Sequence, residues 1–197
     1  MHTRRGIFFQ LILKEAPAQA ALQLSGYRWG LIDRQVVLQD HLFEQKDRRA
    51  KALSRLAQGH FCYGFFDQAG MVAYYMWYTV ASETAALVPW ELNTRLVLNP
   101  KDGYIWDCFT SPDHRRRGLY REGLRMIIAL FGSYQIERYF ICCMRDNIPS
   151  IDAIRSMRFR DIFEFTVSRA GPFVLYKRNG AGWSVGVGMP TFNILSL

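Results

Sequence analysis

Long hydrophobic runs are missing from this sequence. No apolar stretch reaches the ~18 residues that a membrane-spanning helix needs, so we expect neither an integral membrane protein nor a membrane partner. Cysteine is scarce, with four among 197 residues, and none stands in a CxxC pair or in a Cys/His cluster with zinc-site spacing. The sequence therefore predicts no metal ion, and it indicates four buried free thiols in a reducing compartment.

Acidic residues are few relative to basic ones. Lys and Arg number 25 against 17 Asp and Glu, which gives a formal net charge of +8 and a pI near 9.5. Such an excess is typical of proteins that bind an anionic partner. The positive residues gather in one loop and one helix without a recognition motif, so nucleic acid is not the expected partner. Half of the residues are hydrophobic and 15% are aromatic, which excludes intrinsic disorder.

The N-terminus has some features of a secretory signal. Two arginines precede the apolar stretch 6–13, but this stretch is short, contains Gln10 and is followed by Lys14 and Glu15. A first β-strand over Ile7–Leu13 fits these residues better. We therefore expect a cytoplasmic protein.

Hydrophobic patterning predicts both helices and strands along most of the chain. Residues 18–58 are expected to be largely helical, most clearly Gln45–Gln58, which Gly59 ends. Two aromatic-rich strands joined by residues 67–70 form an expected hairpin, and 81–103 are irregular apart from one short extended piece. The expected strands are Phe61–Phe66, Met71–Val80, Thr94–Leu98, Tyr104–Thr110, Tyr139–Met144, Ile162–Ser168 and Pro172–Lys177, and the later helices are Gly118–Phe131 and Pro149–Met157.

The last eighteen residues differ from the rest, because glycines interrupt apolar residues and charge is almost absent. We expect a single domain over residues 1–179 and a glycine-rich apolar tail over 180–197. The tail is either a loosely docked segment or an edge strand that pairs with a second subunit. A homodimer could form through this tail or through a sheet edge.

An unusual concentration of arginine marks the start of the helix that follows the central strand. Arg115, Arg116 and Arg117 are consecutive, and Arg121 and Arg125 follow on the first two turns. A helix N-terminus already carries about half a positive charge and unpaired N–H groups. Two interpretations remain: a solvated surface loop, or a phosphate-binding site in which an anion offsets the charge.

These residues resemble the GNAT superfamily of acyl-CoA-dependent N-acyltransferases. That family has a pyrophosphate loop of the form Gln/Arg-x-x-Gly-x-Gly/Ala after a strand ending in Val-x-Pro. This sequence has Thr-Ser-Pro at 110–112 and Arg-Arg-Arg-Gly-Leu-Tyr at 115–120, so Tyr120 departs from the pattern. The family's second motif, Asn-x-x-Ala/Ser followed by a helix and Gly-Phe, is matched by Asn147 to Ser150 and then Arg158-Phe159, where Arg158 replaces the glycine.

The resemblance implies an α/β (α+β) fold: a mixed, mostly antiparallel sheet of about seven strands with helices on both faces. The sheet would splay between its fourth and fifth strands, Tyr104–Thr110 and Tyr139–Met144. The implied cosubstrate is acetyl-CoA, with pantetheine along the fourth strand and the pyrophosphate on loop amides. The implied cofactor-binding residues are Cys108, Phe109, Thr110, Arg115, Arg116, Arg117, Gly118, Leu119, Tyr120, Arg121, Asn147 and Ser150.

Acyl transfer to an amine needs a base for the amine and an acid for the leaving thiolate. Asp107 is the one charged residue inside the central strand, and it is either that base or a structural aspartate paired with an arginine or a backbone N–H. The family's usual acid, a tyrosine, is replaced by Ile154, which leaves Ser150, Tyr120 or water. Candidate acceptor-binding residues are Tyr75, Trp77, Trp90 and Glu91.

The expected function is therefore an N-acetyltransferase that moves an acetyl group directly from acetyl-CoA to the primary amine of a small molecule. One alternative is a longer acyl donor, either an acyl-CoA or an acyl carrier protein, whose acidic surface would suit the basic helix Gln45–Gln58. Another alternative is a non-catalytic acyl-CoA-binding module that kept the loop and lost the acid.

Overall fold

The structure is a computed structural model that describes residues 2–15, 24–81, 87–89, 95–132, 135–178, 183–187 and 191–193. Its contacts divide the chain into two units. One unit combines Met1–Pro17, Val80–Tyr104 and Gln135–Leu197, and the other combines Ala18–Thr79 and Ile105–Tyr134. We call them the first and the second unit and describe each by itself.

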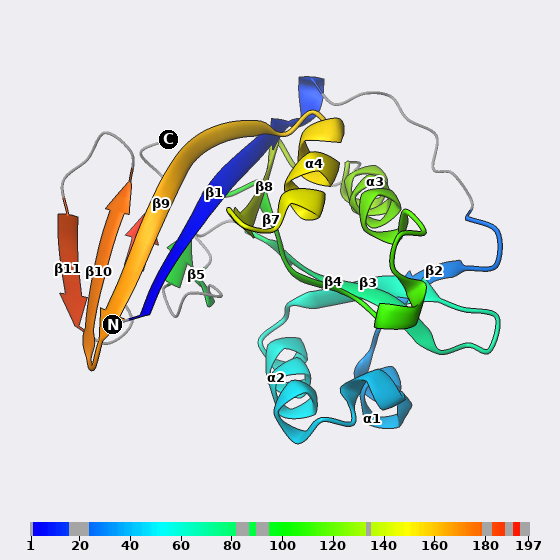
Figure 1. The fold of residues 1–197 in the computed structure, drawn as a ribbon. Coiled ribbons are helices and arrows are strands. Elements are labelled where there is room, and N and C mark those ends of the chain that lie inside the picture. Colours follow the sequence, from blue (N-terminus) through cyan, green and yellow to red (C-terminus); the bar gives the residue numbers. More distant parts are fainter. Residues whose placement is uncertain are drawn as a thin grey trace. The chain divides into compact units, whose positions relative to one another are not determined.

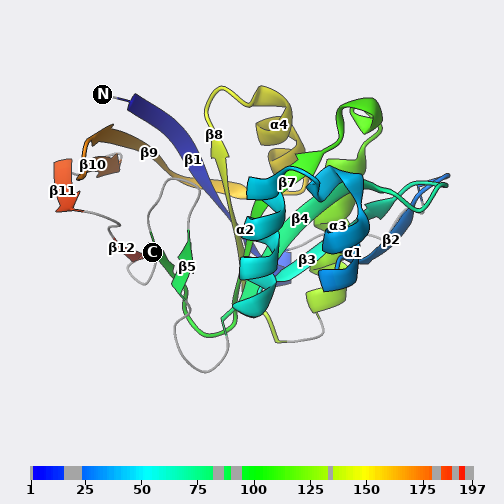
Figure 2. The same cartoon turned by 90° about the horizontal axis from the view of Figure 1, so that it is seen from below.

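The second unit holds a run of four neighbouring strands with helices on both faces; of these strands it includes β7 from Ile105 onward and β4 up to Thr79. The strand order is β7-β4-β3-β2, and β3 pairs antiparallel with both β2 and β4. Helices α1 and α2 lie on one face of these strands and α3 lies on the other (Figures 1 and 2). The bounds are β2 Arg28–Leu31, β3 Phe61–Phe66, β4 Val72–Val80, β7 Asp102–Thr110, α1 Arg34–Gln39, α2 Lys46–Ala57 and α3 Leu119–Phe131.

The hairpin between β3 and β4 forms as the sequence predicts. Asp67 holds the turn, because its Oδ1 accepts hydrogen bonds from the N–H groups of Ala69 and Met71, both at 2.9 Å. Strand β4 is buried on both faces along nearly its whole length. Helix α3 packs closely against it at Gly123, where an added Cβ would lie 2.6 Å from the ring of the fully buried Tyr74. The hairpin therefore supplies the core on which both layers of helices rest.

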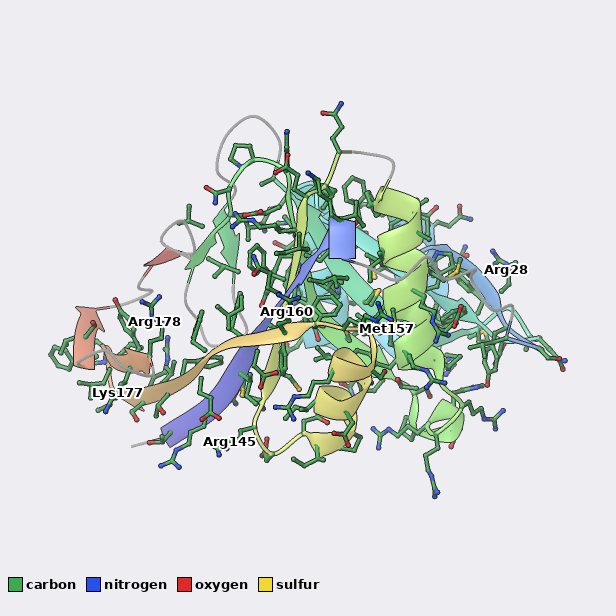
Figure 3. All side chains as sticks on the ribbon, turned by 90° about the horizontal axis from the view of Figure 1, so that it is seen from above. Arg28, Arg145, Met157, Arg160, Lys177 and Arg178 are labelled. Carbon is green, nitrogen blue, oxygen red and sulfur yellow. The ribbon has the colours of Figure 1, made fainter. Side chains whose placement is uncertain are left out.

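The first unit holds a second run of strands in the order β11-β10-β9-β1-β8, all paired antiparallel. Phe8 on β1 is fully buried, and its ring stacks on Phe163 at 5.2 Å and on Tyr104 at 6.1 Å. Lys177 and Arg178 lie on β10, and Arg145 directly follows β8 (Figure 3). The bounds are β1 His2–Ile12, β8 Arg138–Met144, α4 Ile148–Ser156, β9 Arg160–Ala170, β10 Phe173–Arg178 and β11 Trp183–Val187.

A small separate sheet, also in the first unit, has the order β12-β6-β5, with β12 (Thr191–Asn193) parallel to β6 (Arg95–Val97). Strand β5 (Leu87–Pro89) pairs antiparallel with β6. Two strands, β11 and β12, thus lie within the segment expected to be a tail. No helix in the described parts of the chain is long and apolar enough to cross a membrane.

Several details differ from the expectations. The fold class is confirmed, but the strands outnumber the seven expected. Helices do make up most of the described residues 24–58, but the strand β2 also lies inside this segment and was not expected, because its identity depends on pairing with β3 rather than on its own composition. Two of the four free thiols, Cys108 and Cys142, are half-buried rather than buried. The expected splay between β7 and β8 falls at the boundary of the two units and stays a prediction.

Arg158 adopts a backbone conformation that favours glycine. Its φ is 64°, in the left-handed region, at the position where the resemblance leads one to expect glycine. Replacing it in the variant Arg158→Gly should raise the free energy of unfolding by about 1 kcal/mol, because an L side chain is strained there. We expect the melting temperature to rise by about 2–4 °C. The control variant Arg160→Gly should instead lower the free energy of unfolding measured by urea denaturation, since Gly weakens a strand such as β9.

Candidate active site

The C-terminal half of β7 is the part of this strand that is partly exposed to solvent. Asp102 to Trp106 are buried, whereas Asp107 to Thr110 are each half-buried. Asp107 has a φ of 43°, a left-handed conformation that Asp tolerates better than most residues. The strand ends where the N–H of Ser111 donates to the carbonyl oxygen of Ala73, at 2.9 Å.

The loop after β7 leads into the N-terminus of α3 with its N–H groups uncapped. A 3-10 turn (Pro112–His114) is followed by three exposed arginines, of which Arg116 has a φ of 63°. Gly118 is the N-cap residue with a φ of 79°, and no side chain caps the helix. The first N–H groups of an α-helix have no partner inside it. Left-handed residues in such a loop aim successive N–H groups at a common point, which is an arrangement that binds anions.

A chain of polar side chains holds this loop. The Nη1 of Arg117 donates to the hydroxyl of Tyr27 at 3.1 Å, and the same hydroxyl lies 2.9 Å from Nδ1 of His114. The other ring nitrogen of His114 is 3.6 Å from the carboxylate of Asp67 in the hairpin turn. The loop is thereby tied to the β3–β4 hairpin. Tyr27 was not predicted as part of this site, since it falls in a segment expected to be helical.

The variant Tyr27→Phe removes that hydroxyl and keeps the ring. We expect the free energy of unfolding to fall by about 1 kcal/mol, the usual net value of a hydrogen bond, because the Arg117 and His114 contacts are lost together. Thermal denaturation measures the change. In the His114→Asn background, Tyr27→Phe should lower the free energy of unfolding by less. An equal loss in both backgrounds would contradict a hydrogen bond between Tyr27 and His114.

Asp107 lies in an ion pair with Arg55 of α2. The guanidinium of Arg55 also stacks on two indoles, with its Cζ 4.4 Å from the centre of Trp106 and 5.1 Å from that of Trp77. Because these contacts fix Arg55, Asp107 is held by a fixed cation. Arg55 also affects His60, whose pKa is lowered by burial first and by the positive charge of Arg55 second.

Three aromatic rings pack on one another beside the end of β7 that leads into the loop. Tyr75 stacks on Phe109 at 5.7 Å and packs on Phe43 at 5.4 Å. Burial, with the Asp107 carboxylate as the next cause, raises the pKa of Tyr75 well above its usual value. The same two causes, in the same order, raise the pKa of the buried Cys62 thiol. Both groups keep their protons at neutral pH, so Cys62 is not a thiolate nucleophile.

The second unit contains most of the residues that the sequence singled out. Asp107, the half-exposed strand after it and the arginine loop follow one another along the chain, and Tyr120 at the start of α3 lies edge-on to Tyr74 with ring centres 6.3 Å apart. Tyr75 and Trp77 are buried in β4, with exposures of 4% and 1%. Trp90 and Glu91 lie outside the described residues.

Asn147 and Ser150 belong to the first unit. The Asn147 side chain caps α4 by accepting a hydrogen bond from the N–H of Ser150 at 3.4 Å. Ile154, at the position of the family's usual acid, is fully buried. Within the described residues, no group of three or more His, Cys, Asp or Glu side chains could hold a metal ion.

Two arginines of α2 were missed as candidates. Arg48 and Arg55 entered the sequence analysis only as part of the basic helix Gln45–Gln58. A signal was available, because they are seven residues apart and share a face with the buried Ala52 between them. Charged residues at helical spacing beside a buried alanine lie at the edge of a packed face, so these two arginines reach the strand residues instead of solvent.

Solved structures of low sequence identity share this fold. A GNAT-family acetyltransferase structure from Novosphingobium aromaticivorans, described as putative, has a TM-score of 0.54 at 17% identity, over 84% of this chain and 63% of that one. A tandem GNAT protein from the clavulanic acid biosynthesis pathway has a TM-score of 0.54 at 15% identity, over 92% and 55%. An aminoglycoside 6'-N-acetyltransferase from Acinetobacter baumannii has a TM-score of 0.50 at 12% identity, over 74% and 95%.

The first three structural matches, one of them a Drosophila protein, are only 50% to 63% covered by this chain, which thus spans between half and two thirds of their length. No curated protein matches the sequence. The model of the acetyltransferase (GNAT) family matches residues 27–159, which include the loop, Asp107 and the second motif. Because that match covers well over half of the 197 residues, the chain belongs to the GNAT acetyltransferase family.

Proposed function

We propose that this chain is an N-acetyltransferase that moves the acetyl group of acetyl-CoA directly to the primary amine of a small molecule. The observation that carries the proposal is the uncapped N-terminus of α3, preceded by Gly118 in the left-handed region and by three exposed arginines. The family's pyrophosphate motif falls at this place.

The residues of the second unit fit acetyl-CoA as cosubstrate. Backbone N–H groups from Arg116 to Tyr120 would bind the pyrophosphate, and Arg115 and Arg121, both exposed, could reach the remaining phosphate. The half-exposed backbone from Cys108 to Thr110 would bind pantetheine in the manner of an added strand. Asn147 and Ser150, in the first unit, stay cofactor-binding residues predicted from the family's second motif.

The proposed reaction is a direct displacement. The neutral amine nitrogen attacks the thioester carbonyl carbon, the new C–N bond forms, and the C–S bond breaks to release the CoA thiolate. The amine loses its proton to Asp107, which the ion pair with Arg55 keeps in place. The thiolate takes a proton from Tyr120, Ser150 or water, and a thiol of pKa near 8.5 leaves tolerably well without help.

Two alternatives keep the same cofactor loop. A longer acyl donor, including an acyl carrier protein, is favoured by the exposed basic residues Lys46 and Lys51 of α2. A module that binds acyl-CoA without turnover is favoured by Ile154, which is buried where the family has an acid. We further propose a cytoplasmic location, because all four cysteines are free thiols.

The test is release of CoA from acetyl-CoA in the presence of a broad panel of primary amines. Amine-dependent release together with a mass increase of one acetyl group on the amine supports the proposal. Release with long-chain acyl-CoA only would support the longer donor. Tight acetyl-CoA binding without turnover of any amine would support the non-catalytic module.

A further inference from the structure

Arg48 is a half-buried arginine that is fixed in place without an acidic partner. Its Nη1 donates to the carbonyl oxygen of Leu42 at 2.8 Å, and its Cζ lies 4.5 Å from the centre of the Phe109 ring. It makes no ion pair with any Asp or Glu in the described part of the chain. A guanidinium has five N–H donors in a rigid fork, so donors remain beyond the one that Leu42 receives.

The groups around Arg48 leave its guanidinium without a paired carboxylate. The titratable side chains that act on Tyr75 together with Arg48 are Asp107, Cys62 and Arg55. The buried carboxylate of Asp40, two residues before Leu42, accepts its hydrogen bonds from the N–H groups of Leu42 and Val72. Tyr75 and Cys62 are neutral because they keep their protons, and Asp107 and Arg55 offset each other as an ion pair. Arg48 is thus a half-buried cation that no carboxylate of the described residues pairs with, and a charge in such a place is stabilised by an anion.

The position of Arg48 relates it to the proposed base. Asp107 and Phe109 are alternate residues of β7, and Arg48 lies over the second of them. Two residues of a strand span about 6.6 Å. A small molecule can cover a separation of this order with its amine at Asp107 and a second polar group at Arg48.

We propose that Arg48 binds an anionic oxygen group of the acceptor, so that the acceptor is a small amine that also carries a carboxylate or a phosphate. The inference rests on the proposed function, since it presumes that the amine is acetylated at Asp107. The same charge disfavours polycationic amines, which would bring further positive charge against Arg48. Carboxylate and phosphate share the geometry that a guanidinium fork recognises, and the experiment separates them.

The test measures binding to the CoA-loaded protein by isothermal titration with matched pairs of amines. Proteinogenic amino acids are compared with their carboxamides, and 2-aminoethyl phosphate with ethanolamine, so each pair differs only in the anionic group. We expect anionic members to bind at least about tenfold more tightly, as for a charge-assisted hydrogen bond. Arg48→Gln should weaken the anionic members about 10- to 100-fold and leave their neutral partners unchanged.

Two further variants separate a binding role from a structural one. Arg48→Lys keeps the charge without the fork and should retain part of the preference. Arg34→Gln makes the same charge change at an exposed arginine of α1 and should have no effect. Equal binding of anionic and neutral members, or an equal loss of both in Arg48→Gln, would overturn the inference while acetyl transfer could still occur. Failure of the wild type to bind CoA would overturn the inference together with the proposed function.

Discussion

Acetyl-CoA binding should weaken at least about 100-fold in the double variant Arg117→Glu, Gly118→Asp. The first substitution reverses a charge beside the uncapped N-terminus of α3, and the second places a Cβ and a carboxylate where backbone N–H groups would meet phosphate. Losing two or more charge-assisted hydrogen bonds costs about 3 kcal/mol or more, which corresponds to this factor. Isothermal titration of wild type and variant with acetyl-CoA measures the change.

A matched control addresses the net charge. Arg34→Glu, Gln35→Glu changes the charge by the same three units at two exposed positions in the first turn of α1. Acidic residues at a helix N-terminus are favourable, so this control should fold and bind acetyl-CoA as the wild type does. Equal weakening in both double variants would assign the effect to long-range charge and contradict a site at the loop.

The variant Asp107→Asn should lower kcat by about 10²–10⁴, the usual contribution of a general base, while the Kd for acetyl-CoA changes little. Asn has the same shape and its oxygen can still accept a hydrogen bond from Arg55, so the variant removes the proton acceptor and keeps the packing. Single-turnover rates with a saturating amine, measured beside the binding constant, give both quantities.

Arg55→Gln distinguishes the base from a purely structural aspartate. If Asp107 accepts the proton, removing its partner leaves the carboxylate in the strand, and the rate should fall by less than about fivefold, the value of a modest ion pair. If the carboxylate serves only to pair with Arg55, Asp107→Asn and Arg55→Gln should lower the rate by the same factor. The double variant should then lower the rate no further than either single variant does.

The sequence predicted those elements whose residues determine their own structure. The β3–β4 hairpin was predicted because Asp67 and Gly70 specify the turn and aromatic residues specify the strands. Helix α3 was predicted from its apolar face and from Gly118, and the first helical residue is the next one. The loop between β7 and α3 was identified for the same reason, since charge and glycine there are local features.

The remainder depends on partners far away in the sequence. Strand β2 is a short segment with a glycine whose residues become a strand only through pairing with β3, where Trp29 stacks on Tyr63 at 5.9 Å. The ion pair of Arg55 with Asp107 joins residues 52 positions apart, and Tyr27 reaches Arg117 across 90. No local pattern specifies such contacts, so the sequence predicted Asp107 as a site residue but did not predict its ion pair with Arg55.

The central claim is that acetyl-CoA binds along the end of β7 and at the N-terminus of α3. Hydrogen–deuterium exchange with and without acetyl-CoA tests it most directly, because both regions would bind through backbone N–H groups. The account predicts slower exchange in peptides that cover Cys108 to Thr110 and Arg116 to Arg121, with β2 and β3 unchanged. Unchanged exchange in both regions at a saturating concentration of acetyl-CoA, or protection confined to other elements, would contradict it.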